Sequence, residues 1–169
     1  LILGGAGSRL EDLVAGYSAF ARGGVAARPR LQPQDALHER RLLSPGAAWV
    51  VRRILAGQSR PDRDPRAELV QRPVLAWKTG TSYGYRDAWS VGFDGRITIG
   101  VWVGRPDGAP VPGLVGRTAA APILFDAFAR TGKIPAALPK PPRGVLVASN
   151  AKLPPPLRRF RPLGELVRS

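Results

Sequence analysis

A chain of 169 residues with 44% hydrophobic residues is long enough to form one globular domain with a core. The absence of cysteine excludes disulfides and thiolate metal sites, while the single histidine, His38, excludes a histidine-cluster metal site and leaves little room for a Ser-His-Asp triad. The formal net charge of +14 raises the question of a nucleic acid or anionic membrane partner, but half of the excess lies in residues 133–169, which carry 8 basic and 1 acidic side chains.

Residues 10–22 predict an amphipathic helix, because their apolar side chains recur at helical spacing and two acidic residues lie in the first turn. Gly23-Gly24 ends this pattern. A loop or short strand is expected through residues 25–43, and within it we expect His38 to be a solvated surface residue.

A second helix is predicted over residues 45–56. We expect Ser44 to be its N-cap, Pro45 its first helical residue, and Gly57 the residue that ends it. Residues 58–72 are charged and contain prolines, so we expect an exposed loop there.

Three strands are predicted next, over residues 73–79, 88–94 and 96–104. Asp94-Gly95, at the junction of the last two, is a strong signal for a two-residue hairpin turn. The order of elements so far is helix, helix and three strands, which favours an antiparallel sheet.

A closing helix is predicted over residues 118–130, and beyond residue 135 recurrent prolines leave no helical period. The whole order indicates an α+β fold, with an antiparallel sheet packed against helices. We therefore expect one domain over residues 1–132, followed by a proline- and arginine-rich linker, or the start of a truncated C-terminal domain, over residues 133–169.

The run Lys78-Thr79-Gly80-Thr81-Ser82 carries the clearest chemistry of the chain. The ammonium of Lys78 can hold a carboxylate or help to move a proton, and the hydroxyl of Thr79 can bind the same anion. Gly80 has no side chain, so a substrate backbone can approach the strand and pair with its edge. The backbone N–H of Thr81 can point at a developing oxyanion.

The longer string over residues 76–93, AWKTGTSYGYRDAWSVGF, resembles the class A (bifunctional) penicillin-binding proteins of the 1C type. The resemblance continues through residues 100–104 and 116–120 and covers roughly residues 1–132. It implies a partial penicillin-binding/β-lactamase-like transpeptidase fold, of which this chain is the C-terminal, distal part.

The same resemblance implies roles for the motif residues. Lys78 and Thr81 would be catalytic, and Thr79, Gly80, Thr81 and Ser82 would bind substrate. The partners implied are a peptidoglycan stem peptide ending in D-Ala-D-Ala and β-lactams, with no cofactor and no metal. The implied location is the periplasmic face of the bacterial inner membrane, reached through an N-terminal segment outside this chain.

The nucleophile of this family is expected outside the chain. The family needs S-x-x-K and S-x-N before K-T-G, and neither precedes Lys78; the S-x-x-K at residues 149–152 follows it, in a proline-rich stretch without a predicted helix. We therefore expect the chain alone to be inactive. It starts at Leu1 and contains no methionine, so we expect a piece of a longer protein. It has no apolar run of 18 residues, so we expect none of its segments to span a bilayer.

Other interpretations remain open at this point. A basic, non-enzymatic module that binds nucleic acid or an anionic glycan would explain the charge. The opening residues 1–10 are similar to the glycine loop of sugar-nucleotide transferases, although the acidic helix that follows would repel a phosphate. The four tryptophans could stack on nucleic acid bases, but three of them lie on predicted strands beside aliphatic residues, which favours packing in the core or along a cleft wall.

Overall fold

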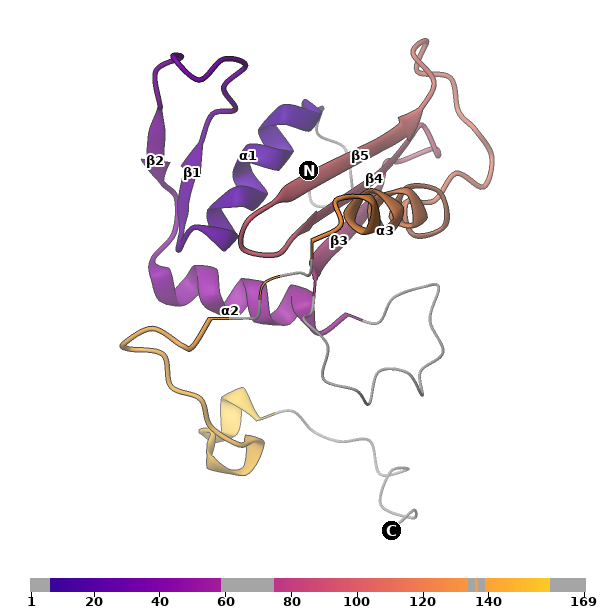
Figure 1. The fold of residues 1–169 in the computed structure, drawn as a ribbon. Helices are drawn as coiled ribbons and strands as arrows, with labels where there is room; N and C mark the ends of the chain where they lie inside the picture. Colours follow the sequence, from indigo (N-terminus) through magenta and orange to yellow (C-terminus); the bar gives the residue numbers. More distant parts are fainter. Residues whose placement is uncertain (1–6, 59–74, 134–135, 137–138, 159–169) are drawn as a thin grey trace, which may run out of the picture.

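The computed structural model describes residues 7–58, 75–133, 136 and 139–158 (Figure 1). A three-stranded antiparallel sheet forms its centre, and helices pack on both faces of this sheet. The predicted α+β class is therefore confirmed. None of the helices within the described ranges is long and apolar enough to cross a membrane.

Helix α1 (Leu10–Ala21) begins where the sequence predicts it and ends at a pair of glycines. Gly23 and Gly24 both have positive φ, of 62° and 95°, which side chains with a Cβ rarely tolerate. A Cβ on Gly24 would also lie 2.1 Å from the carbonyl oxygen of Leu43. Close packing and backbone conformation thus both require glycine at this turn.

The next segment, predicted as a loop or short strand, forms an antiparallel ribbon of two strands, β1 (Val25–Ala27) and β2 (Glu39–Arg41). Each strand has only three residues, too few to show an alternating hydrophobic pattern, so the second strand leaves no signal in the sequence. His38, just before β2, is exposed as predicted.

Helix α2 (Pro45–Ala56) has the ends that the sequence predicts. Ser44 is the N-cap, and its Oγ accepts a hydrogen bond from the amide of Ala47 at 3.2 Å. Proline occupies the first helical position, and glycine follows the last one. The loop predicted over residues 58–72 lies, after its first residue, outside the described part of the chain.

The sheet has the strand order β3-β4-β5, with β3 (Ala76–Thr81), β4 (Asp87–Phe93) and β5 (Thr98–Gly104). The prediction that the first strand ends at Thr79 is wrong, because Gly80 and Thr81 both pair with β4. The chain reverses later, where Gly84 and Tyr85 have positive φ of 76° and 57°. Residues 73 and 74 of the predicted strand lie outside the described residues.

The connection between β4 and β5 includes Asp94-Gly95, as predicted, but it has four residues (94–97) instead of two. Oδ1 of Asp94 accepts hydrogen bonds from the amides of Gly95, Arg96 and Ile97 at 2.6, 2.7 and 2.9 Å. The carboxylate satisfies three donors of the wider turn, and this is the physical reason why the two-residue prediction is wrong.

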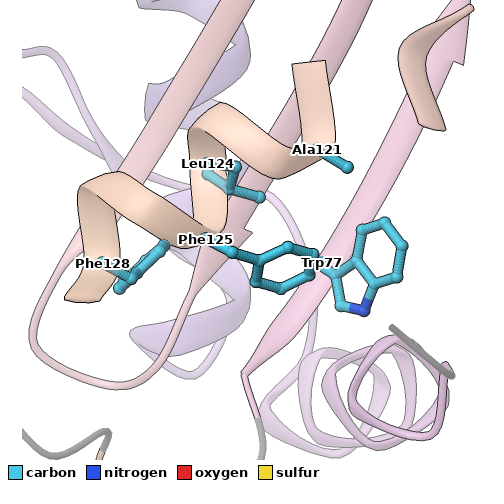
Figure 2. Packing of buried hydrophobic residues seen from close by; sticks show 5 residues of the cluster. All are labelled: Trp77, Ala121, Leu124, Phe125 and Phe128. Atoms are coloured by element: carbon cyan, nitrogen blue, oxygen red, sulfur yellow. The ribbon is translucent and has the colours of Figure 1, made fainter. Parts of the chain in front are cut away.

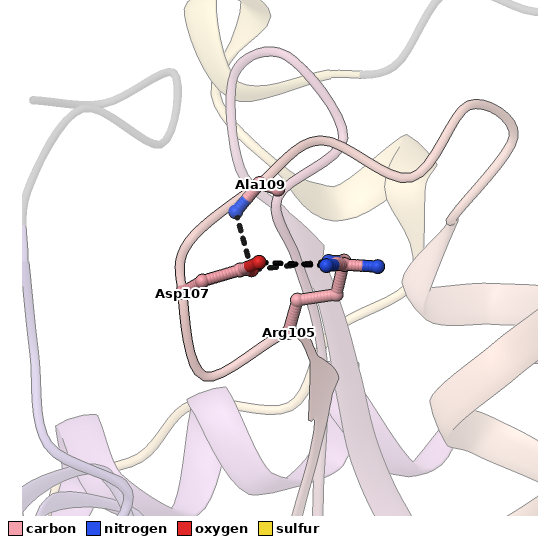
Figure 3. Close-up of polar contacts among 3 residues, drawn as sticks. All are labelled: Arg105, Asp107 and Ala109. Carbon is pink, nitrogen blue, oxygen red and sulfur yellow. Dashed lines mark hydrogen bonds and ion pairs between the residues drawn. The ribbon is translucent and has the colours of Figure 1, made fainter.

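The loop after β5 is held together by one carboxylate (Figure 3). Asp107 accepts from Nε and Nη2 of Arg105 at 3.0 and 2.6 Å and from the amide of Ala109 at 3.0 Å. Further along, the amide of Val111 donates to the carbonyl of Tyr85 at 2.9 Å. This loop therefore packs against the turn that connects β3 and β4.

The closing helix begins at Gly116, before its predicted start at residue 118. A π-helical turn (Gly116–Ala120) leads directly into α3 (Ala121–Arg130). A Cβ on Gly116 would lie 2.3 Å from the carbonyl oxygen of Gly80 and 2.7 Å from that of Trp89. Glycine is needed because the start of the helix lies directly on the backbone of β3 and β4.

Two apolar clusters hold the helices on opposite faces of the sheet. The α3 cluster comprises Trp77, Ala121, Leu124, Phe125 and Phe128 (Figure 2). The α1/α2 cluster comprises Leu55, Ala56, Ala76 and Phe93, with Tyr17, Phe20, Ala21 and Val51 packed against it. Since successive strand residues point to opposite faces, Ala76 and Trp77 identify the two faces at the start of β3.

Part of the predicted linker packs against α2 and the β4–β5 connection (Figure 1). Nε1 of Trp49 donates to the carbonyl of Pro139 at 2.8 Å, and the amide of Ala136 donates to Oδ2 of Asp94 at 3.2 Å. The predicted division of the chain at residues 132 and 133 stays a prediction, but these contacts anchor the first part of the segment that follows.

Candidate active site on strand β3

Strand β3 carries the lysine-threonine-glycine motif along the edge of the sheet. Among the described strands, only β4 pairs with β3, so the opposite edge of β3 has no described strand beside it. Lys78 and Gly80 are exposed, and Thr79 and Thr81 are half-buried. The structure thus places these predicted site residues in one continuous edge strand.

The main-chain groups of Thr79 and Thr81 point to this open edge. The amide of Ser82 donates to the carbonyl of Asp87 at 2.9 Å, so these two residues continue the β3–β4 register as a hydrogen-bonded pair just beyond the end of β3. Hydrogen-bonded and non-hydrogen-bonded pairs alternate along an antiparallel ladder, so the N–H and C=O groups of Thr81 and Thr79 face away from β4. An extended peptide can pair with these groups.

The side chains of the motif lie on two faces of the strand. Lys78 and Gly80 share the face of the α1/α2 cluster, and Thr79 and Thr81 share the face of α3. Nζ of Lys78 donates to the carbonyl oxygen of Thr79, which keeps the ammonium beside the main chain. The ammonium and the two hydroxyls can therefore act on one anion only at the open edge of β3.

The hydroxyl of Thr81 is fixed by the start of the closing helix. Oγ1 accepts a hydrogen bond from the amide of Gly116 at 3.0 Å. A threonine hydroxyl has one donor as well as its acceptor sites, so its O–H remains able to donate to an anion. The helix that follows the sheet thus orients one of the predicted site residues.

Ser82 and Asp87 brace the hairpin that follows the motif. Oγ of Ser82 accepts from the amide of Asp87 at 2.8 Å, and Oδ1 of Asp87 accepts from Nε1 of Trp102 at 2.8 Å. These contacts fix the direction in which β4 leaves the turn. The predicted contact of Ser82 with substrate stays a prediction.

The tryptophans divide between the core and a ring pair beside the motif. Trp77 and Trp49 are 1% and 9% exposed, whereas Trp102 is 38% exposed. The rings of Trp89 and Trp102 lie 6.3 Å apart, and a Cβ on Gly80 would lie 3.7 Å from Cβ of Trp89. The predicted packing in the core is confirmed for Trp77 and Trp49, whereas a cleft wall formed by the other two tryptophans stays a prediction.

Two further polar residues lie on the α3 side of the sheet, near β3. Cζ of Arg117 lies 5.6 Å from the ring centroid of Trp77. Ser90 is completely buried opposite Thr79, and within the described part of the chain its Oγ has no hydrogen-bond partner. The sequence does not predict the surroundings of either residue, because they depend on how the strands and the closing helix pack together.

The second S-x-x-K run does not form a comparable site. Ser149 precedes a single 3₁₀ turn (Asn150–Lys152), and both Ser149 and Lys152 are exposed. A single exposed turn does not provide the buried helix expected around a serine nucleophile and its lysine base.

Residues 1–6 of the glycine-rich opening lie outside the described residues.

At the start of α1 there is a shallow groove of about 550 Å³, which contains none of the motif residues and is lined by Arg9, Leu10, Glu11, Val14 and Pro29. In the described ranges no three acidic or histidine side chains are grouped in a way that would hold a metal ion.

Comparison with known proteins shows which relatives share this sequence. No protein-family model matches the chain. Penicillin-binding protein 1C of Escherichia coli strain K12 is 57% identical over 124 residues, which are 73% of this chain and 16% of that protein. Penicillin-binding protein 1A of Neisseria gonorrhoeae is 30% identical over 156 residues, which are 80% of this chain and 19% of that protein.

The fold agrees with these relatives. The crystal structure of penicillin-binding protein 1A from Haemophilus influenzae matches with a TM-score of 0.58 at 19% identity, covering 78% of this chain and 28% of that one. The sheet with its helices is therefore part of a penicillin-binding protein fold.

The chain belongs to the class A penicillin-binding proteins, and the predicted resemblance to the 1C type is confirmed. It spans less than a fifth of the length of the two curated relatives. None of these matches supports a basic module for nucleic acid or glycan.

Proposed function

We propose that this chain is the distal part of a serine D,D-transpeptidase domain, in a protein that also carries a peptidoglycan glycosyltransferase. The observation that carries the proposal is the edge of β3, where the backbone N–H of Thr81 and the side chains of Lys78 and Thr79 border the same open strand. The names of the relatives, all penicillin-binding proteins, support the same class of ligand.

In the proposed reaction the stem peptide pairs with the open edge of β3. Its terminal carboxylate binds the hydroxyls of Thr79 and Thr81 and the ammonium of Lys78. A serine from outside this chain attacks the carbonyl carbon of the penultimate D-Ala, and the oxyanion receives the N–H of Thr81. The peptide bond breaks, and the terminal D-Ala leaves with a proton.

The second half of the reaction regenerates the serine. The amine of a neighbouring stem peptide attacks the serine ester, the new peptide bond forms, and the serine oxygen takes back a proton. The mechanism uses no cofactor and no metal. β-Lactams enter the same site because they present a carbonyl and a carboxylate as the stem peptide does.

The substrate determines where this reaction takes place. Peptidoglycan stem peptides lie on the periplasmic face of the inner membrane, so we place the domain there, held by a membrane segment outside this chain.

The proposal is tested by acylation of the full-length protein with a fluorescent penicillin. Lys78→Ala removes the ammonium, and we expect the acylation rate to fall by about 100-fold or more, as for the loss of a group that stabilises transition-state charge. Lys133→Ala, which removes an exposed lysine after α3, serves as the control and should acylate at the normal rate. Equal rates for the two variants would overturn the role of Lys78.

A further inference from the structure

The segment that follows α3 runs along α2 in the direction opposite to the helix (Figure 1). One end of this segment is anchored beside the C-terminal half of α2. The amide of Ala136 donates to Oδ2 of Asp94 at 3.2 Å, and the main-chain carbonyl of Asp94 accepts a hydrogen bond from Arg52 of α2. Arg52 is only 4% exposed. The β4–β5 connection thus joins this end of the segment to a buried residue of the helix.

Two further contacts lie progressively closer to the start of α2. Nε1 of Trp49 donates to the carbonyl of Pro139 at 2.8 Å, about one helical turn before Arg52. In the first turn of the helix, Cγ2 of Val145 lies 3.1 Å from the position that a Cβ on Gly46 would occupy. The order 136, 139, 145 along the segment therefore matches the order 52, 49, 46 along the helix, and the two run antiparallel.

The chemistry of α2 suits a proline-rich segment at the middle contact. Residues 139–142 have the sequence PKPP, and prolines favour the polyproline II conformation, in which carbonyl groups lack partners within the segment. The indole of Trp49 is 9% exposed, and its N–H supplies a donor to one of these carbonyls. Grooves that recognise polyproline II segments are likewise lined by aromatic rings. Helix α2 therefore offers both the donor and the aromatic surface that such a segment requires.

The side chains become exposed directly after Val145. Leu146 and Val147 are 87% and 59% exposed, and the described residues that follow include only two short 3₁₀ turns, Asn150–Lys152 and Pro155–Leu157. A flexible linker is expected to leave the domain soon after the last helix. Here the chain passes along α2 first, so the segment does not behave as a free linker until Leu146.

We propose that Ala136 and residues 139–145 form a strap that belongs to the folded domain, and that α2 is the surface to which this strap binds. The strap moves the end of the domain from residue 132 to residue 145. It also holds Leu146, where the following segment starts, at the first turn of α2. The inference is independent of the proposed function, because it uses none of the motif residues and its tests do not measure acylation.

A disulfide across the first turn of α2 tests the strap in the full-length protein. The chain has no cysteine, so Gly46→Cys combined with Val145→Cys adds one pair to it, and any cysteine elsewhere in the protein is replaced by serine. Cγ2 of Val145 marks a position that a cysteine Sγ can take. Its distance of 3.1 Å from a Cβ at residue 46 is close to the Cβ-to-sulfur distance across a disulfide, about 3 Å. We expect oxidised glutathione to convert this pair to an intramolecular disulfide.

Gly46→Cys combined with Leu146→Cys is the matched control, because the side chain of Leu146 is next in the chain and is exposed. Peptide mapping by mass spectrometry without reductant measures both bonds. We expect the bond between positions 46 and 145 to form at least about tenfold faster than the bond between positions 46 and 146. Equal rates, or no bond in either variant, would overturn the inference, because a free linker brings both residues to α2 equally often.

Limited trypsin digestion of the full-length protein examines the middle contact separately. Trypsin cleaves after Arg143, within the strap, more readily when the strap opens locally. Trp49→Phe keeps an aromatic ring and removes the N–H donor, so we expect cleavage there to become about 2- to 10-fold faster. Trp102→Phe removes a hydrogen bond of the same length, 2.8 Å to Asp87, outside the strap and should leave this cleavage unchanged. A wild-type rate for Trp49→Phe, or equal acceleration by both changes, would contradict the strap.

Discussion

At the scale of single residues, Ser90 is the clearest anomaly of the site. It is completely buried on the α3 face, opposite Thr79, and its Oγ has no partner within the described residues. A buried hydroxyl without a partner costs folding free energy, typically about 1–3 kcal/mol. The serine next to the motif residue Thr79 therefore lowers the stability of the domain.

Ser90→Ala therefore tests whether the hydroxyl is unsatisfied. We expect the change to raise the free energy of unfolding of the domain by about 1 kcal/mol, since it removes the buried polar group and leaves only a small space. Ser18→Ala is a suitable comparison, because Oγ of Ser18 donates to the carbonyl of Ala15 at 2.7 Å and its loss should destabilise. Calorimetric melting of both variants measures the difference. A clear destabilisation by Ser90→Ala would show that the hydroxyl has a partner.

Residue-scale predictions from the sequence succeed where the interaction is local. Ser44 caps α2 because the side chain and the amide it binds are three residues apart. Arg52 carries no such signal, although it is 4% exposed and donates to the carbonyl of Asp94. Its partner lies 42 residues away, and only the assembled fold brings the two together.

At the scale of elements, Asp94 joins the β4–β5 connection to the segment that follows α3. Burial acts to raise the pKa of its carboxyl, but hydrogen bonds from the amides of Ile97, Arg96 and Ala136 outweigh burial and hold the pKa below its ordinary value of 3.8. The ionised form is thus favoured in the folded state. The stability that Asp94 contributes is complete above its ordinary pKa and is lost as the pH falls through the lower folded pKa.

The lowered pKa of Asp94 predicts that the hydrogen bonds to its carboxylate are lost only in acid. Protection of the amides of Arg96, Ile97 and Ala136 against hydrogen exchange should be constant between about pH 7 and pH 5 and should fall only below about pH 4. Asp94→Asn keeps an oxygen acceptor but no charge, so its weaker protection should not depend on pH in this range. Protection in the wild type that declined between pH 7 and pH 5 would contradict the assignment.

Element boundaries show what local sequence cannot determine. The sequence predicts that the first strand ends before Gly80, but pairing with β4 keeps Gly80 and Thr81 in strand β3. The start of the closing helix at Gly116 depends on the space above the carbonyls of Gly80 and Trp89. The existence and order of the longer elements follow from hydrophobic periodicity, whereas these ends depend on contacts between strands and the helix.

At the scale of the whole molecule, we propose that the chain contributes one side of an active site. The motif, its edge strand and the helix that orients Thr81 are all present, and the resemblance carried by residues 76–93 was sufficient to predict the family and the fold class. The position of the closing helix beside Thr81 could not be predicted, because it depends on contacts between the helix start and the assembled sheet. The proposed nucleophile belongs to a part of the protein outside this chain.

The location of the acylated serine tests this account most directly. The full-length protein is labelled with penicillin, digested, and mapped by mass spectrometry. We predict a single labelled serine that precedes Leu1 in the full-length sequence, in an S-x-x-K run, and no label on the isolated 169-residue chain. A penicillin-labelled serine within residues 1–169 would contradict the central claim that this chain supplies the substrate-binding edge and another segment supplies the nucleophile.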